Sequence, residues 1–460
     1  MKLPSWISSS CSSETATSIA KHSMINSIPA QKSVLFSDSS SFSDINQGNG
    51  SSSSSSCSST SQDSSDSNSS LQSSLSIATH PSIPSLQKLS PESFNLSVKT
   101  LSITSLKSPE NAAIVNSLQV HDNLLFAVSG SQVSVFDVNN NLQLLHTFNN
   151  PHNKKEPSPS SSSPRGSIKS LAFIDGKIFT AHQDCKIRAW ELKPKQQQYY
   201  KQIATLPTME DFFRNFILPK NYIKVRRHKK KLWVQHFDAV SSLAVDNNNL
   251  LYSVSWDKYL KIWSGKDFRC LESIKAHDDA INAIVVSHDG LVYTGSADKK
   301  IKVWGKPLGE KKNVLIATLE KHKSAVNALA LSSDGSVLFS GSNDRSILVW
   351  EKEDSANHMV VSGALRGHGK AILCLIHVSD LLFSGSADRT VRIWHRAFDG
   401  RYCCLTVLEG HAKPVRSLAA AEGEVGGGMT VFSGSFDGEI KVWKVVVSSD
   451  LKTSEESEDY

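Results

Sequence analysis

One repeated pattern constrains the fold of this chain more than any other feature. Residues 291–304 alternate apolar and polar side chains around a short polar turn, which is typical of two short antiparallel strands. Near-copies of this stretch run to further tryptophans, namely Trp263, Trp350, Trp394 and Trp443. The intervals between the tryptophans are close to the ~40–45 residues of one four-stranded propeller blade. Because a regular period outweighs any single element, we predict an all-β propeller.

Two more copies of the pattern lie upstream, which brings the number of blades to seven. Residues 178–190 form a clear copy that ends at Trp190. Residues 124–136 form a degenerate copy in which Phe136 replaces the tryptophan. With these motifs the chain resembles the WD40-repeat proteins over about residues 93–447. The resemblance implies a seven-bladed WD40 β-propeller.

The last blade lacks a fourth strand of its own, because the chain turns polar and acidic soon after Trp443. The resemblance implies that an N-terminal strand fills this place, and the alternating segment at residues 94–103 is the expected donor. Closure of this kind removes an open sheet edge, so we expect a closed, monomeric ring. The first two blades are expected at about residues 112–148 and 167–206.

Both ends of the chain differ from the propeller in composition. Residues 1–92 are rich in serine and residues 448–460 are polar and acidic, and neither segment can bury enough apolar area to offset chain entropy. We predict that both are disordered, with the serine clusters either phosphorylated or an unselected linker. No apolar stretch is long enough for a signal peptide core or a membrane span. The seven cysteines show neither zinc spacing nor a disulfide framework, which indicates a reduced protein of the cytoplasm or the nucleus.

Five blades carry the same four residue types, in the order His, Ser or Thr, Asp and Trp. The five quartets are His236, Ser253, Asp257 and Trp263; His277, Thr294, Asp298 and Trp304; His322, Ser340, Asp344 and Trp350; His368, Ser384, Asp388 and Trp394; and His411, Ser433, Asp437 and Trp443. A Ser-His-Asp catalytic centre needs one constellation, whereas a structural bond is needed in every blade. The resemblance implies that each quartet joins strands b and c to nearby loops by hydrogen bonds. We therefore predict structural roles, no catalytic residues, no metal site and no cofactor.

Blade 2 departs from this pattern. It keeps Thr180, Asp184 and Trp190, but Pro164 stands where its histidine is expected.

The largest departure from a plain repeat is an insertion at about residues 207–235. Thr208 and Asp211 have the spacing of a helix N-cap, and Pro219 ends the run. This predicts a short helix whose apolar side packs on the propeller, with the members Phe212, Phe213, Phe216 and Ile217. A basic patch follows, with the members Arg226, Arg227, Lys229, Lys230 and Lys231. Since the insertion joins strand d of one blade to strand a of the next, we expect the patch on the same face as the b–c turns.

The insertion also resembles that of the plant WD40 proteins of the JINGUBANG type, which implies a non-enzymatic regulator. Three interpretations of the basic patch stay open. It is a solvated surface without a dedicated partner, or it binds an acidic or phosphorylated protein segment or acts as a nuclear-import signal. The third and least favoured interpretation is a surface for nucleic acid or anionic lipid.

Two positions in each blade are expected at the mouth of the central channel, one at the start of strand a and one before the turn aspartate. The first set is Lys169, Ser241, Asn282, Asn327, Leu373 and Arg416, and the second set is Gln183, Trp256, Asn343 and Phe436. These are the candidate partner-binding residues. Trp256 and Phe436 are either recognition residues, since aromatic residues dominate binding hot spots, or they pack on neighbouring turns.

Two classes of function follow. The favoured class is a non-enzymatic scaffold or adaptor for a protein partner, in regulatory signalling or transcriptional control in a plant cell. A special case is a substrate receptor of a cullin-type ubiquitin ligase, whose WD40 members carry Trp-Asp-x-Arg at a blade end. Only residues 190–193 approach that motif, with both polar positions substituted. The other class is an enzyme that uses the channel, but the residues expected at the mouth include no Asp, Glu or His.

Overall fold

The computed structural model describes the propeller and little outside it. The described residues are 83–87, 96–98, 101–107, 114–149, 166–193, 199–226, 229–307, 309–310, 312–352, 359–397, 399–422 and 428–449. The chain divides into two units, Met1–Ile77 and Ala78–Tyr460, and all the described residues belong to the second unit. The predictions for Arg227, for most of the N-terminal arm and for most of the acidic tail therefore lie outside the described residues.

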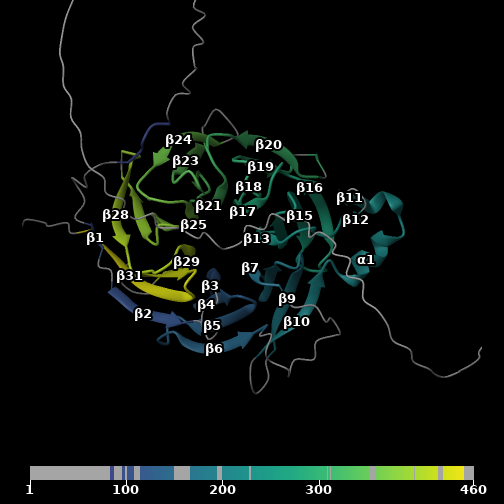
Figure 1. Ribbon diagram of the computed structural model, residues 1–460, viewed down its shortest axis with the longest axis horizontal. Helices are drawn as coiled ribbons and strands as arrows, with labels where there is room; N and C mark the ends of the chain where they lie inside the picture. The colour runs from purple at the N-terminus through teal and green to yellow at the C-terminus, as the bar shows by residue number, and fades with distance from the viewer. Residues whose placement is uncertain are drawn as a thin grey trace, which may run out of the picture. The chain divides into compact units, whose positions relative to one another are not determined.

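Seven antiparallel sheets stand around a central axis as the blades of a propeller (Figure 1). In each of blades 1 to 6 four strands pair in chain order, with strand a nearest the axis and strand d at the outside. The predicted all-β class and the predicted number of blades are confirmed.

The strands of blades 1 to 6 have the following bounds. Blades 1 and 2 comprise β3 (Val115–His121), β4 (Leu124–Ser129), β5 (Gln132–Asp137) and β6 (Gln143–Phe148), then β7 (Ile168–Ile174), β8 (Lys177–His182), β9 (Ile187–Lys193) and β10 (Tyr199–Leu206). Blades 3 and 4 comprise β13 (Val240–Val245), β14 (Leu250–Ser255), β15 (Tyr259–Ser264) and β16 (Cys270–Lys275), then β17 (Ile281–Val286), β18 (Val292–Ser296), β19 (Ile301–Gly305) and β20 (Val314–Leu319). Blades 5 and 6 comprise β21 (Val326–Leu331), β22 (Val337–Ser342), β23 (Ile347–Lys352) and β24 (Met359–Leu365), then β25 (Ile372–Val378), β26 (Leu381–Ser386), β27 (Val391–Arg396) and β28 (Tyr402–Leu408).

Blade 7 is completed by strands from both ends of the propeller. It comprises β29 (Val415–Glu422), β30 (Gly428–Ser435) and β31 (Glu439–Ser449), with β2 (Leu101–Lys107) and β1 (Leu96–Val98) paired antiparallel to β31. In the register, Leu101 faces Lys444 and Lys107 faces Glu439. The predicted closure is confirmed, but the outer strand has two parts and runs past residue 103 to Lys107.

The hydrophobic core lies between neighbouring blades. Val254 and Leu260 of blade 3, for example, pack with Ile281, Val292 and Trp304 of blade 4. One such cluster joins each pair of neighbouring blades around the ring. A single blade would leave both of its apolar faces in water, so the sheets are stable as a ring rather than one by one.

A short segment that precedes the propeller strands lies on the outer strands of blades 5 and 6. Residues 83–87 form isolated parallel bridges to these strands. The Leu86 amide donates to the carbonyl oxygen of Ala364 at 3.2 Å, and the Leu86 carbonyl oxygen accepts from the amide of Tyr402 at 3.0 Å. The Leu86 side chain covers Gly363, where an added Cβ would lie 2.4 Å from it. These residues fall within the arm predicted to be disordered, and for them the structure corrects that prediction, because the blade edges satisfy their backbone.

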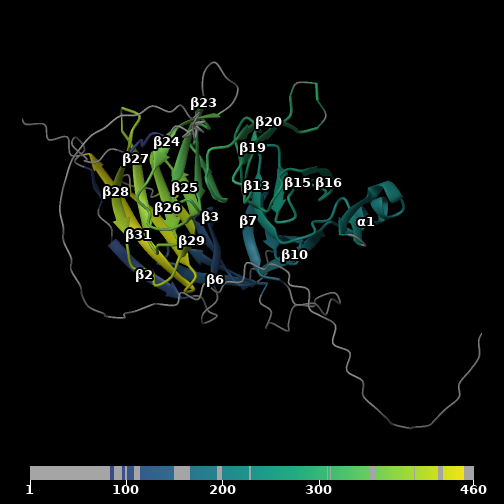
Figure 2. The same cartoon turned by 45° about the horizontal axis from the view of Figure 1, so that its top comes forward.

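The insertion between blades 2 and 3 forms a helix, a 3-10 turn and a hairpin. These elements are α1 (Met209–Phe216), η1 (Pro219–Asn221), β11 (Tyr222–Arg226) and β12 (Lys229–Leu232). The Asp211 amide donates to Thr208 Oγ1 at 3.1 Å, which is the predicted N-cap. Figures 1 and 2 place α1 at the outer rim of the ring, and Figure 1 shows the hairpin beside it. The insertion therefore lies at the rim of the ring. Its residues Met209 and Lys231 line one pocket with Lys186 of the b–c turn of blade 2, in agreement with the predicted face.

The apolar side of α1 does not pack on the propeller as predicted. Of the four predicted residues, Phe212 alone packs against the core between blades 2 and 3. Phe213, Phe216 and Ile217 are 59%, 48% and 74% exposed. The reason is that Asp211, on the opposite side of α1, is hydrogen-bonded to blade 3. Among the described residues, no helix has the length and apolar character needed to cross a bilayer.

Candidate functional site

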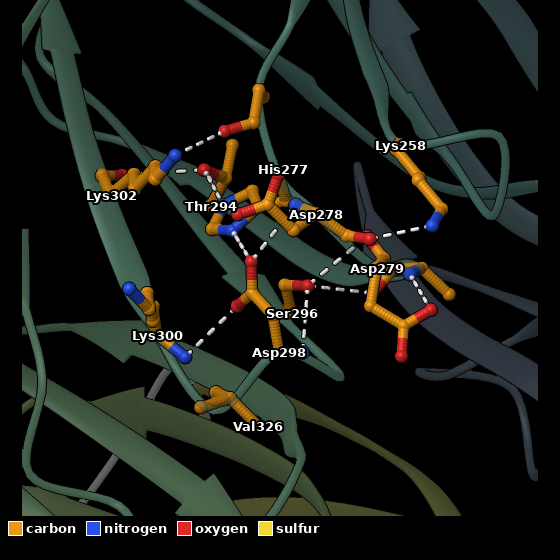
Figure 3. Close-up of polar contacts among 12 residues, drawn as sticks. Lys258, His277, Asp278, Asp279, Thr294, Ser296, Asp298, Lys300, Lys302 and Val326 are labelled. Atoms are coloured by element: carbon orange, nitrogen blue, oxygen red, sulfur yellow. Dashed lines mark hydrogen bonds and ion pairs between the residues drawn. The ribbon is translucent and has the colours of Figure 1, made fainter.

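The quartet of blade 4 forms one connected network, and Figure 3 shows its members His277, Thr294 and Asp298. His277 Nδ1 lies 2.8 Å from Asp298 Oδ2, and its Nε2 lies 2.8 Å from Thr294 Oγ1. Thr294 Oγ1 also accepts from Trp304 Nε1 at 3.0 Å. The other carboxylate oxygen of Asp298 accepts from the amide of Lys300 at 3.0 Å. The network therefore ties the loop before strand a to the b–c turn and to strands b and c.

Blades 3, 5 and 6 repeat this geometry. The distance from His Nδ1 to Asp Oδ2 is 2.8 Å in each of the pairs His236–Asp257, His322–Asp344 and His368–Asp388. The serine hydroxyl of each quartet accepts from the tryptophan indole at 2.8–2.9 Å, and the members are Ser253, Ser340 and Ser384. These serines are fully buried. A hydroxyl held between an imidazole and an indole in a buried site is a satisfied structural group rather than a reachable nucleophile.

The quartet of blade 7 has a longer distance between its histidine and its aspartate than the quartets of blades 3 to 6. His411 Nε2 lies 2.7 Å from Ser433 Oγ, but its Nδ1 lies 3.8 Å from Asp437 Oδ2 and has no hydrogen-bond partner. Among the described residues, His411, Asp437 and Glu439 are the one group whose ligand atoms come close enough for a metal ion, within 4.8 Å of one another. Lys441 Nζ lies 3.6 Å from Glu439 Oε2. This ammonium group opposes a second cation at the same place.

Blade 2 takes its histidine from a position that the pattern did not indicate. His182 Nε2 lies 2.7 Å from Thr180 Oγ1, which also accepts from Trp190 Nε1 at 2.9 Å. Asp184 forms an ion pair with Arg188 instead of a histidine. His182 on β8 thus takes the role of the quartet histidine in blade 2, where Pro164 stands at the expected position. The sequence could have indicated this role, because Thr180 and His182 are two residues apart in one strand and therefore lie on the same face of the sheet.

The quartet carboxylates of blades 3 to 6 are ionised at neutral pH, because the pKa of each is lowered. Burial raises the pKa of Asp298, but hydrogen bonds from His277 and from two amides outweigh burial and lower this pKa to about 2. The same balance lowers the pKa of Asp344 and of Asp388. Burial lowers the pKa of His236 against the attraction of Asp257. Carboxylates that stay ionised and hydrogen-bonded inside a blade are poor general acids and bases.

These carboxylates predict how stability responds to acid. The pKa of Asp298 is about 2 in the folded chain, below the ordinary value of 3.8, so the unfolded chain takes up the proton first. The stabilisation is present above about pH 4, and we expect the free energy of unfolding to fall between about pH 4 and pH 2. Urea titrations across this range measure the slope. Asp298→Asn is expected to flatten it, whereas the exposed Asp289→Asn is not, and equal slopes in the two variants would contradict the assignment.

The central channel is lined by strand a of every blade. It encloses a volume of about 210 Å³. All six residues of the first predicted set line it, namely Lys169, Ser241, Asn282, Asn327, Leu373 and Arg416. Among the described lining residues, Lys169 and Arg416 are the only charged side chains, and there is no Asp, Glu or His.

Some of these side chains also join neighbouring blades. Ser241, Asn282 and Asn327 each donate to the carbonyl oxygen of the first residue of strand a in the next blade, at 2.5 Å, 2.9 Å and 2.8 Å. Asn116 of blade 1 lines the channel as well and donates to Ser167 Oγ at 2.9 Å. The prediction omitted Asn116 because blade 1 is a degenerate repeat, although the preceding Ile-Val pair marks the start of strand a there.

The second predicted set lies outside the channel lining. Its members are Gln183 and Asn343, which are exposed, and Trp256 and Phe436, which are half-buried. Lys169 Nζ lies over the Trp256 ring at 5.8 Å from its centroid. Asn343 Oδ1 accepts from Asn327 Nδ2 at 2.6 Å. Trp256 and Asn343 therefore extend the surface of the lining residues. The Phe436 amide donates to the carbonyl oxygen of Pro414 at 3.1 Å.

The basic patch is described in part. Lys230 is exposed, and Lys231 is half-buried with its Nζ 5.9 Å from the centroid of the Phe237 ring. The side chains of Arg226 and Lys229 lie outside the described residues, as does Arg227.

Comparison with known families agrees with this geometry. The family model described as "WD domain, G-beta repeat" matches residues 228–264, 268–305, 313–351, 359–395 and 402–444. Each segment contains strands a to c of one of blades 3 to 7, and the last four segments begin with strand d of the preceding blade. Blades 3 to 7 are the blades that carry a full His-Ser/Thr-Asp-Trp quartet. The fold and its repeated quartets thus define a class, the propellers built of WD40 repeats.

The chain is a WD40-repeat β-propeller protein, and such domains typically act as scaffolds for protein interaction. No curated protein matches the chain.

Proposed function

We propose that this protein is a non-enzymatic scaffold whose channel mouth binds an acidic or phosphorylated segment of a partner protein. One observation carries the proposal. Among the described residues that line the channel, the only charged side chains are two cations, Lys169 and Arg416. A guanidinium group binds phosphate or carboxylate through two parallel hydrogen bonds, and an ammonium group adds a second positive charge.

The quartets support the non-enzymatic part of the proposal. Their imidazole and carboxylate groups bond to one another inside the blades, so they are committed to the fold. The insertion, with its resemblance to plant regulators, supports a role in signalling or transcriptional control in the cytoplasm or the nucleus of a plant cell.

The test is a binding measurement on the full chain with synthetic peptide pools. Three pools of equal length carry phosphoserine, glutamate or glutamine at fixed positions in otherwise random sequence. We expect the phosphorylated and acidic pools to bind in a salt-dependent way, because the contact is electrostatic. Lys169→Glu and Arg416→Glu are each expected to weaken that binding by about tenfold, or ~1.4 kcal/mol.

The matched control is Lys306→Glu, an exposed lysine after strand c of blade 4, at the strand end opposite the b–c turn. It is expected to leave binding unchanged. Circular dichroism checks that all variants are folded. Equal binding of the neutral pool, or equal loss in the Lys306 variant, would refute the proposed site.

A further inference from the structure

Helix α1 presents its apolar residues to solvent. Met209 is 68% exposed, and together with Phe213, Phe216 and Ile217 it forms one stripe, since residues three, four and seven apart share a helix face. Single exposed apolar residues are common on folded proteins. A contiguous exposed stripe of four large residues instead marks an interaction site.

The polar side of α1 holds this orientation in place. Asp211 is 4% exposed, and its carboxylate accepts from the amide of Cys270, the first residue of β16, at 2.9 Å. Asn215 Oδ1 accepts from Trp233 Nε1 at 2.9 Å. Turning the helix over would leave these buried polar groups without partners, which is costly. The outward apolar stripe is therefore built into the fold and is not a frayed surface.

A groove runs beside the stripe along the outer strand of blade 2. It has a volume of about 680 Å³, and its walls include Ile203 of β10 with Met209 and Phe212 of α1. Pockets of roughly 300–1,000 Å³ bind drug-sized groups, so this groove has room for large side chains of a bound segment. Lys186 and Lys231 stand at its border.

The charge around the groove and stripe is positive. The exposed lysines of this region are Lys186, Lys220, Lys224 and Lys230. Of the acidic side chains in this region, Asp184 is paired with Arg188 and Glu210 with Arg214. Asp238, which acts on Cys185 in the groove, is exposed, so the lysines outnumber the unpaired carboxylates. A partner that covers the stripe therefore meets net positive charge at its margin and is favoured by carboxylates there.

We propose that α1, the groove beside it and these lysines form a second docking surface, at the rim of the ring, for an acidic amphipathic segment of a partner protein. The segment places large apolar side chains on the stripe and in the groove, and its Asp or Glu residues beside the lysines. This mode is the packing of an amphipathic helix into an apolar groove. With the channel mouth, it gives the propeller two separate contact surfaces.

A protein segment fits these observations better than a membrane. A bilayer is flat on the scale of α1, and a groove of this volume beside the helix would stay unfilled. The helix has eight residues and is about 12 Å long, which is short for an element that lies in a lipid interface.

The test uses a phage-displayed library of random 16-residue peptides against the full chain. Selected peptides are then measured on the double variant Phe213→Ser/Ile217→Ser. The matched control is Leu144→Ser/Leu145→Ser, which changes two apolar residues on β6 of blade 1 that are 45% and 40% exposed. We expect enriched peptides with apolar residues at helical spacing and with Asp or Glu, and we expect the Phe213/Ile217 variant to weaken their binding by about tenfold or more while the control does not.

A parallel arm incubates the full chain with vesicles of phosphatidylcholine and phosphatidylserine, and light scattering measures self-association. Vesicle binding or dimerisation that disappears in the Phe213/Ile217 variant would overturn the proposal in favour of a lipid surface or a second copy. Failure to enrich peptides, enrichment of basic peptides, or binding that survives the variant would also overturn it. Binding at the channel mouth is measured separately with Arg416→Glu, so the two surfaces succeed or fail independently.

Discussion

Replacing His322 with alanine is expected to lower the free energy of unfolding by about 3 kcal/mol. The imidazole lies 2.8 Å from the Asp344 carboxylate and 2.7 Å from the Ser340 hydroxyl, in a site where the histidine side chain is 1% exposed. Its removal leaves a mostly buried carboxylate and a buried hydroxyl without their main partner, and it also leaves a cavity.

The same substitution at His411 provides the matched control. His411 is equally buried, but its Nδ1 lies 3.8 Å from Asp437 and only its Nε2 is hydrogen-bonded. We therefore expect His411→Ala to cost about 1–2 kcal/mol, close to one lost hydrogen bond with its packing.

Urea unfolding followed by tryptophan fluorescence and circular dichroism measures both variants. The informative quantity is the difference between them, because size and residue type are the same. Equal losses of the free energy of unfolding would show that the longer distance from His411 to Asp437 does not weaken the contribution of this histidine. A negligible loss at His322 would remove the argument that the quartets hold the blades together.

Deleting residues 1–107 is expected to abolish the folded monomer. The deletion removes β1 and β2 and leaves β31 as an unpaired edge strand. At about 0.5–1.5 kcal/mol for each net hydrogen bond, a ladder of six residue pairs with β2 is worth roughly 5 kcal/mol, which rivals the stability of an ordinary domain. The exposed edge also invites pairing between chains, so we expect aggregation in size-exclusion chromatography.

A shorter deletion separates closure from the rest of the N-terminus. Removing residues 1–95 keeps β1 and β2 but removes residues 83–87 with their contacts to blades 5 and 6. We expect a monomer whose melting temperature drops by only a few degrees, since three backbone hydrogen bonds are lost. A folded monomer after the longer deletion would contradict the closure argument.

The architecture was predictable because it repeats. The copies of the pattern that end at Trp263, Trp304 and Trp350 each predict the same four-stranded unit. An element that is unclear in one blade can therefore be assigned from its counterpart in the others. The lining of the channel followed for the same reason, since strand a begins in the same way in each blade. His182 was missed because it lies in strand b, two residues after Thr180, whereas the other quartet histidines lie in the loop before strand a.

Features that depend on contacts between distant elements could not be predicted. The stripe of apolar residues on α1 has the spacing of a buried helix face. Hydrogen bonds from Cys270 to Asp211 and from Trp233 to Asn215 turn that face outward. The contact of Leu86 with Gly363, on a blade far along the chain, could not be predicted either. In both cases the deciding interaction joins residues that no local pattern connects.

The closure of blade 7 also sets the order in which the protein can be made. β2 leaves the ribosome before any complete blade, whereas its partner β31 follows all the strands of blades 1 to 6. The hairpins of blades 1 to 6 form from neighbouring residues, but the pairing of Leu101 with Lys444 has to wait until β31 has been synthesised. Until then the nascent chain carries an open ring, and the last step of folding is the slow pairing of β2 with β31.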